Sequence, residues 1–107
     1  MIDDFERAFR NQSSAALKRL QPSLTDSQLA VWDRLFVDHT SYFVEVIGPV
    51  TSPVRPDRVR VDGAIIRNIV PRDGGAPRRI ETKPATIVLD RDRDGWVITD
   101  VRGPNWP

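Results

Sequence analysis

The sequence predicts an α+β fold, in which two to three N-terminal helices pack on a curved, four-stranded antiparallel sheet. In the first third of the 107 residues, apolar residues recur at spacings of three and four, which is the period of an amphipathic helix. After position 39, aromatic and β-branched runs alternate with turns rich in Gly, Pro and Asp, as in hairpin-linked strands. Helices that precede a run of hairpins are typical of α+β domains with the helices on one face of the sheet.

Two short helices are expected first. Phe5 and Phe9 lie on the apolar side of a helix over about residues 2–11. The polar residues that follow favour caps and turns over helix interiors. A second helix is therefore expected over about residues 14–20, with Ser13 as its N-cap.

A third helix is expected over about residues 26–38. Thr25 and Gln28 have the spacing of a capping box, in which the Thr hydroxyl accepts from the Gln28 amide and the Gln28 side chain reaches back to the Thr25 amide. Leu29 and Trp32 then lie on one side of this helix, which is expected to face the sheet.

Four strands follow in the predicted order, separated by segments rich in turn residues. They are expected at residues 42–47, 58–70, 78–89 and 96–102. Residues 48–57 contain three prolines and are expected to form a loop.

The whole chain, residues 1–107, is expected to form a single domain that ends in a tail. The alternation of the second strand fails at Asp62-Gly63, which predicts a β-bulge or a sharp bend. The tail, residues 103–107, contains prolines and cannot extend a central strand. The expected core consists of Phe5, Phe9, Leu17, Leu20, Leu29, Trp32, Phe36, Val44, Val46, Val61, Ile65, Val88, Trp96 and Ile98.

Composition excludes several classes of protein. The chain has no Cys, which excludes a disulfide scaffold, a Cys-ligated zinc site and a thiol nucleophile. The net charge is +1, and the arginines alternate with aspartates, so no nucleic acid partner is expected. No apolar run approaches the ~20 residues that span a bilayer, so this segment is not expected to insert into a membrane. No cofactor is predicted, and the cellular compartment is left open.

One segment matches half of a calcium-binding loop. Asp90, Asp92 and Asp94 alternate with arginines and precede Gly95, as oxygen ligands and the turn glycine do in such loops. The final position needs a bidentate Glu but is Val101, and the flanking residues have strand patterns. Asp and Gly equally supply the dihedral angles of a hairpin turn. We therefore predict no metal site, with this loop as the one candidate.

Five residues are candidates for a ligand pocket between the helices and the sheet: Trp32, Phe36, His39, Tyr42 and Arg67. Their aromatic members concentrate where the third helix meets the first strand, and such residues both fill cores and line apolar pockets. Arg67 is charged within an apolar strand, and it either pairs with Glu81, faces a polar ligand or lies on a solvated face. His39, the only histidine, either acts as a lone general base or lies half-exposed at a helix end.

The order of motifs resembles the NTF2-like superfamily, which includes SnoaL-type cyclases and ketosteroid isomerases. The resemblance is carried by the junction Leu20-Gln21-Pro22-Ser23-Leu24-Thr25, the Trp in the helix that follows, and the closing run from Asp94 to Ile98. It is strongest to small NTF2-like modules of larger bacterial proteins, including some serine/threonine kinases and lipoproteins. The resemblance implies a cone whose mouth lies between the helices and the concave sheet. In the superfamily's enzymes, Asp, His or Tyr side chains inside the cone perform acid–base chemistry.

Because the matching interior positions are apolar here, we expect a non-catalytic NTF2-like module for small-ligand sensing or protein assembly. The ligand would be small and apolar. The alternative is a small enzyme of the SnoaL or ketosteroid isomerase type that acts on an apolar substrate through His39, Tyr42 or Asp100.

A homodimer through the exposed sheet face is also expected. Apolar residues occupy both faces of the predicted strands, as in the pairs Ile65 with Ile66 and Ile87 with Val88. One helix-covered face does not need so many apolar residues.

Overall fold

The computed structural model describes residues 1–107 as three helices and one four-stranded sheet. The helices are α1 (Ile2–Arg10), α2 (Ser14–Leu20) and α3 (Asp26–Asp38). The strands are β1 (His39–Arg55), β2 (Arg58–Pro71), β3 (Arg78–Asp92) and β4 (Gly95–Arg102). Neighbouring strands are antiparallel, in the order β1-β2-β3-β4. The α+β prediction is confirmed.

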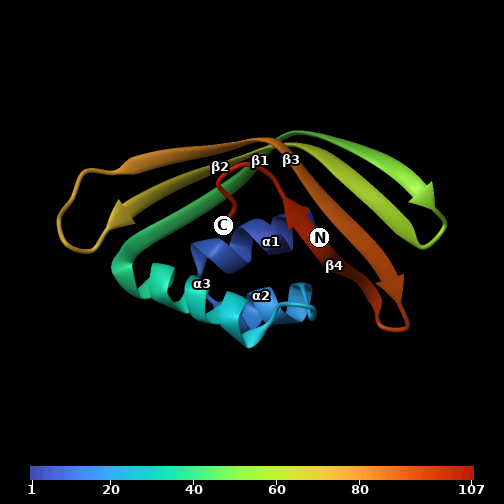
Figure 1. The fold of residues 1–107 in the computed structure, drawn as a ribbon, viewed down its shortest axis with the longest axis horizontal. Helices are drawn as coiled ribbons and strands as arrows, with labels where there is room; N and C mark the ends of the chain where they lie inside the picture. The colour runs from blue at the N-terminus through green and yellow to red at the C-terminus, as the bar shows by residue number, and fades with distance from the viewer.

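The sheet arches over the helices, which lie on its concave side together with the C-terminus (Figure 1). The hairpins extend beyond the helices, so the molecule measures 47 × 27 × 20 Å. No helix is long and apolar enough to span a membrane.

The helices begin where the sequence predicts. The Ser13 hydroxyl accepts a hydrogen bond from the Ala16 amide at 3.1 Å. At α3, the Thr25 hydroxyl accepts from the Gln28 amide at 3.2 Å, and the Gln28 side-chain oxygen accepts from the Thr25 amide at 2.8 Å. These bonds satisfy amides that have no partner within the helix.

The predicted loop at residues 48–57 is wrong, because β1 continues through this segment to Arg55. Pro49 and Pro53 lack an amide hydrogen. A central strand pairs with neighbours on both sides, so every one of its amide hydrogens would be needed. However, β1 is an edge strand and pairs only with β2, so a missing donor can face away from the ladder. The prolines therefore indicate an edge strand, not a loop.

The predicted bulge in β2 is confirmed. Pairing with β3 shifts between Gly63 and Ile65, and a Cβ atom on Gly63 would lie 2.6 Å from the carbonyl oxygen of Ile47. Ile65 belongs to the core, whereas Ile66, outside the core cluster, is still only 6% exposed. Val88 is also buried. A single chain therefore covers both residues, so these two apolar side chains do not require a second copy.

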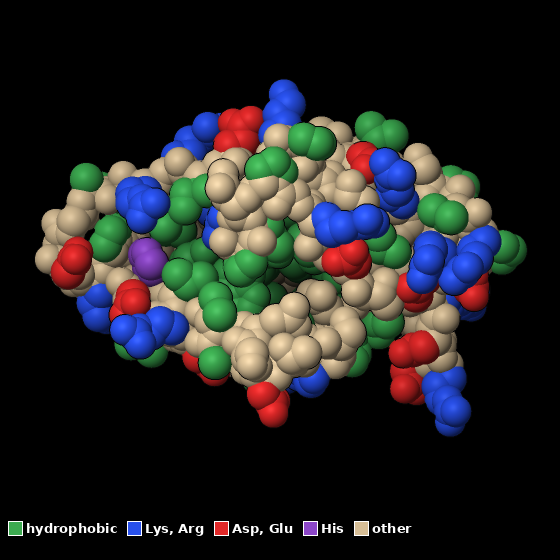
Figure 2. Space-filling model, viewed as in Figure 1, with side chains coloured by type: hydrophobic (Ala, Val, Ile, Leu, Met, Phe, Trp, Pro, Cys, Tyr) green, Lys and Arg blue, Asp and Glu red, His purple; other side chains and the backbone are tan.

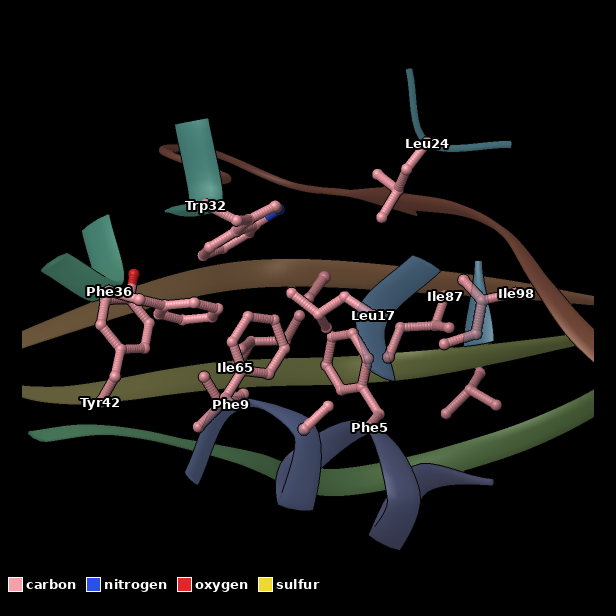
Figure 3. Close-up of a cluster of buried hydrophobic side chains, with 14 of the residues drawn as sticks. Phe5, Phe9, Leu17, Leu24, Trp32, Phe36, Tyr42, Ile65, Ile87 and Ile98 are labelled. Atoms are coloured by element: carbon pink, nitrogen blue, oxygen red, sulfur yellow. The ribbon is translucent and has the colours of Figure 1, made fainter. Parts of the chain in front are cut away.

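The core lies between the concave face of the sheet and the helices (Figure 3). Most of the expected core residues are buried, and Leu20, Leu29 and Val46 are half-buried against them. Trp96 is the exception, with 36% of its surface exposed. It pairs with Arg91 near the end of the β3–β4 hairpin, which extends past the helices (Figure 1).

The C-terminal segment, Gly103–Pro107, does not extend β4, but it packs against the core. The ring centroid of Trp106 lies 5.2 Å from that of Trp32 and 5.8 Å from that of Phe9. The segment leaves β4 in close contact with β3, since a Cβ atom on Gly103 would lie 2.8 Å from the Pro84 carbonyl oxygen. The last residues of the chain are therefore part of the packing under the sheet.

Candidate functional site

Two pockets open on the concave side of the sheet, and the C-terminal segment borders both. Trp106 and Pro107 line the first, and Asn105 and Pro107 line the second. The five residues predicted as one pocket are divided between them. Trp32 lines the first pocket, whereas His39, Tyr42 and Arg67 line the second, and Phe36 lines neither.

The first, here called the mouth pocket, has a volume of about 380 Å³. Its apolar residues are Phe5, Phe9, Leu17, Leu24, Val31, Trp32, Val101 and Trp106. The others are Gln21, Ser27, Gln28, Asp100 and Pro107. Figure 2 shows a hollow in this face of the molecule, with hydrophobic side chains in its depth. A mainly apolar pocket of this size is typical of small-molecule sites.

Local hydrogen bonds position the connection between α2 and α3, which forms one wall of the mouth pocket. The Lys18 ammonium donates to the carbonyl oxygens of Pro22 and Leu24, both at 2.7 Å. The capping box fixes the next turn, and from it α3 presents Val31 to the pocket. Val31 is 46% exposed, which leaves its side chain available for contact with a ligand.

The second, here called the Arg67 pocket, has a volume of about 480 Å³ and contains basic residues but no acidic ones. It is lined by Leu35, His39, Tyr42, Arg67, Ile69, Arg78, Ile80, Asn105 and Pro107. One side of this pocket is the junction of α3 and β1. Gln12 holds this junction by donating to the carbonyl oxygens of Phe36 at 3.0 Å and His39 at 2.9 Å.

Aromatic rings fill the space between the two pockets. The Phe36 centroid lies 5.6 Å from that of Tyr42 and 6.0 Å from that of Trp32, and Phe9 lies 4.9 Å from Trp32. Figure 3 shows these rings in one layer between the helices and the strands. Aromatic packing therefore closes the centre of the concave space.

Arg67 is buried without a carboxylate partner. Its side chain is only 3% exposed, and no ion pair joins it to any acidic residue. The guanidinium donates from Nη1 to the Tyr42 hydroxyl at 3.1 Å and from Nη2 to the Asn105 carbonyl oxygen at 2.5 Å. It also lies 5.1 Å from the centroid of Trp106, while Nε has no partner. The suggested pairing with Glu81 is wrong, because that carboxylate pairs with Arg79.

Of the three residues considered for catalysis, His39 and Tyr42 come together, whereas Asp100 lies apart. The Nδ1 of His39 lies 2.7 Å from the Leu35 carbonyl oxygen, which can only accept, so Nδ1 carries the proton and donates. His39 contacts Tyr42, with ring centroids 5.6 Å apart. Asp100 borders the other pocket, and its carboxylate forms an ion pair with Arg102, with Oδ2 and Nε 2.8 Å apart.

The aspartates of the candidate calcium loop do not converge. Asp90 accepts from Arg58 at 2.6 Å and from Thr99 at 2.7 Å, whereas Asp92 accepts from the Asp94 amide at 2.8 Å. No group of three or more His, Asp or Glu side chains is placed to hold a metal ion. The geometry is that of an Asx turn in a hairpin.

The Arg58 guanidinium and the Thr99 hydroxyl lower the pKa of Asp90 from 3.8 to about 2. Asp90 therefore contributes stability above pH 4 that is lost as the pH falls from 4 towards 2. The variant Asp90→Asn is expected to lower Tm by about 5 °C at pH 7 and to leave it nearly unchanged at pH 2. Thermal unfolding across this range checks the prediction. Asp33→Asn, on the exposed side of α3, should show no such pH dependence, and equal behaviour of the two variants would contradict it.

Sequence reasoning missed the α2–α3 connection and the C-terminal segment as pocket walls. Gln21 belongs to the Leu20–Thr25 junction and Ser27 to the capping box, but neither motif marks a pocket wall, and Val31 lies outside any motif. Trp106 carried a usable signal, since tryptophan side chains are highly buried on average.

Comparison with known proteins supports the architecture at the level of the fold. No family model matches the chain, and no curated protein matches its sequence. Among solved structures, an NTF2-like superfamily protein from Salmonella enterica serovar Typhimurium is similar, with a TM-score of 0.76 and 14% identity, over 98% of this chain and 87% of that one. A protein from Streptomyces avermitilis, proposed to be a dehydratase of the NTF2-like family, has a TM-score of 0.67 and 18% identity, over 92% of this chain and 86% of that one.

A proposed calcium/calmodulin-dependent protein kinase II association domain from Xanthomonas campestris is also similar. Its TM-score is 0.75 at 11% identity, over 97% of this chain and 84% of that one. Identities this low establish a shared architecture and leave activity open. With three helices under an open antiparallel sheet and these structural neighbours, the chain has the NTF2-like fold.

Proposed function

We propose that the chain is a non-catalytic ligand-binding module whose mouth pocket takes a small, uncharged and mainly apolar molecule. The observation that carries this proposal is the apolar pocket of about 380 Å³, with the half-exposed Val31 at its edge. Burial of apolar surface contributes about 25 cal/mol per Å², so such walls favour an apolar occupant.

The polar residues of the mouth pocket favour a neutral ligand with one or two polar atoms. Gln21, Ser27 and Gln28 are uncharged, and the side-chain oxygen of Gln28 is already engaged in the capping box. Asp100 is the one acidic residue in the lining, and Arg102 neutralises its carboxylate. A hydroxyl or carbonyl group therefore matches the donors and acceptors better than a charge does.

Two arrangements favour binding over catalysis. His39 uses its proton-bearing nitrogen on the Leu35 carbonyl oxygen, and Phe36 with its neighbouring rings separates His39 from the mouth pocket. Asp100 pairs with Arg102 instead of facing a second titratable group. General acid–base catalysis needs such a group within hydrogen-bond reach of the reacting atom.

A calorimetric titration with 2-naphthol tests this proposal. The wild-type protein is expected to bind it, and Val31→Glu is expected to weaken binding at least about tenfold, because a charge would enter the apolar rim. Val37→Glu is the matched control, since Val37 lies on the same helix, is 65% exposed and does not line the pocket. Absence of binding, or equal weakening by both variants, would contradict the proposal.

We also propose that two copies of the chain associate through β1. This strand carries a row of exposed apolar side chains, namely Phe43, Ile47, Val50 and Val54, which are 42–62% exposed. Its outer edge has no partner strand. A second copy fits this row, because a two-fold axis would bring the row of one chain against the same row of the other and bury both. The association domain from Xanthomonas campestris shares this fold, which is consistent with a role in assembly.

Sedimentation velocity tests the association. Wild-type protein at about 100 μM is expected to be dimeric, because weak interfaces are occupied in this range of concentration. Ile47→Lys should be monomeric, because the substitution places a charge in the apolar row. Val37→Lys introduces the same charge on α3 and should remain dimeric. A wild-type monomer at this concentration would overturn the proposal.

A further inference from the structure

We propose that the Arg67 pocket is a second binding site, specific for a small organic carboxylate. It lies on the other side of the aromatic layer from the mouth pocket, so its occupant is distinct from the neutral ligand proposed above. The proposal rests on the buried guanidinium, on the basic character of the lining and on the apolar walls.

The guanidinium of Arg67 lacks the negative partner that burial requires. Burying a charge without a counter-charge is costly, and removal from water is ordinarily offset by an ion pair. The three neutral groups around Arg67, the Tyr42 hydroxyl, the Asn105 carbonyl and the Trp106 ring, offset only part of this cost. A carboxylate in the pocket would supply the missing charge.

A second basic residue of the pocket is suited to the same anion. Arg78 lines the pocket from β3, is exposed and forms no ion pair of its own. Glu81 is the acidic residue nearest to Arg78 in the sequence. It pairs with Arg79 and does not line the pocket, so it does not neutralise Arg78.

The apolar part of the lining specifies an organic acid instead of an inorganic anion. Leu35, Ile69 and Ile80 form walls beside the basic residues. A carboxylate matches the guanidinium in geometry and charge, and its hydrocarbon body would contact these walls. Inorganic phosphate would place polar oxygens against the same apolar surface.

Thermal unfolding in sodium benzoate tests the site, with sodium chloride at equal ionic strength as the reference. Benzoate at about ten times its Kd should raise the wild-type Tm by about 5–10 °C. Methyl benzoate, which has the same ring without the charge, and inorganic phosphate should give smaller shifts. A benzoate shift equal to that of sodium chloride, or matched by methyl benzoate or by phosphate, would overturn the proposal.

Two variants connect the shift to the pocket. Arg67→Met should abolish the benzoate shift, and because an apolar residue of similar length replaces an unpaired charge, the variant should fold. Arg78→Ala, at an exposed position, should weaken benzoate binding about tenfold, since it removes one charged hydrogen bond. Arg79→Ala is the matched control and should bind as the wild type does. Equal benzoate shifts in Arg78→Ala and the wild type would contradict the assigned site.

These experiments distinguish failure of the mouth-pocket proposal from failure of the Arg67-pocket proposal. Val31→Glu removes 2-naphthol binding without changing the benzoate shift if each pocket has its own ligand. If Arg67 only anchors the C-terminal segment, Arg67→Met lowers Tm, and the wild type shows no benzoate shift.

Discussion

Replacing Phe9 by alanine is expected to lower the free energy of unfolding by about 3–5 kcal/mol, which is the range for removal of a buried aromatic ring. Phe9 is 0% exposed, and its ring lies within 6.2 Å, centroid to centroid, of Phe5, Trp32, Phe36, Tyr42 and Trp106. Small domains have only about 5–15 kcal/mol of net stability, so the variant would be near its unfolding limit at 37 °C. Urea denaturation measures the loss.

Phe43→Ala provides the matched control for Phe9→Ala. Phe43 is 49% exposed on β1, and its replacement should cost less than about 1 kcal/mol in dilute protein. Similar losses in the two variants would show that the aromatic layer is not the centre of the core.

Replacing Trp106 by alanine is expected to lower the free energy of unfolding by about 3 kcal/mol, because the substitution removes a large side chain that packs against the core. The indole packs on Trp32 and Phe9, and the variant would also expose Arg67, whose guanidinium lies over the ring. Urea denaturation again gives the magnitude, and near-ultraviolet circular dichroism should show the loss of coupled tryptophan signals.

Trp96→Ala separates the effect of position from that of residue type. Trp96 lies near the end of the β3–β4 hairpin and is 36% exposed, so its loss should cost about 1 kcal/mol. If Trp106→Ala were no more destabilising than Trp96→Ala, the C-terminal segment would not be packed under the sheet.

Local chemistry made the helices predictable. The hydroxyl of Ser13 and the pair Thr25 and Gln28 determine where α2 and α3 begin, because the capping bonds involve residues no more than three positions apart. The bulge at Gly63 was predictable for a similar reason. A break in the two-residue period of a strand is typical of a β-bulge or a sharp bend.

The strand at residues 48–55 was not predictable from local chemistry. Proline composition indicates a loop unless the strand is known to be at an edge, and edge position depends on the whole sheet. Trp96 was misplaced for a related reason, since its aromatic character predicts burial while the length of its hairpin carries it past the helices.

The candidate pocket was predicted in composition but not in arrangement. Trp32, Tyr42 and Arg67 line pockets, but the C-terminal segment borders both and there are two pockets in place of one. This division depends on contacts between residues far apart in the chain, such as Trp106 with Arg67, which is 39 positions away, and with Trp32, which is 74 positions away. The spacing of residues along the sequence does not predict such long-range contacts.

The central claim is that a neutral apolar ligand occupies the pocket between α3 and the C-terminal segment. Two of the three tryptophans, Trp32 and Trp106, line that pocket, whereas Trp96 does not. The most direct measurement follows the three indole N–H signals in nitrogen–proton correlation spectra during a titration with 2-naphthol. The account predicts that the signals of Trp32 and Trp106 shift together along one saturating curve while that of Trp96 stays in place. Three unmoved signals, or a shift of Trp96 equal to the others, would contradict it.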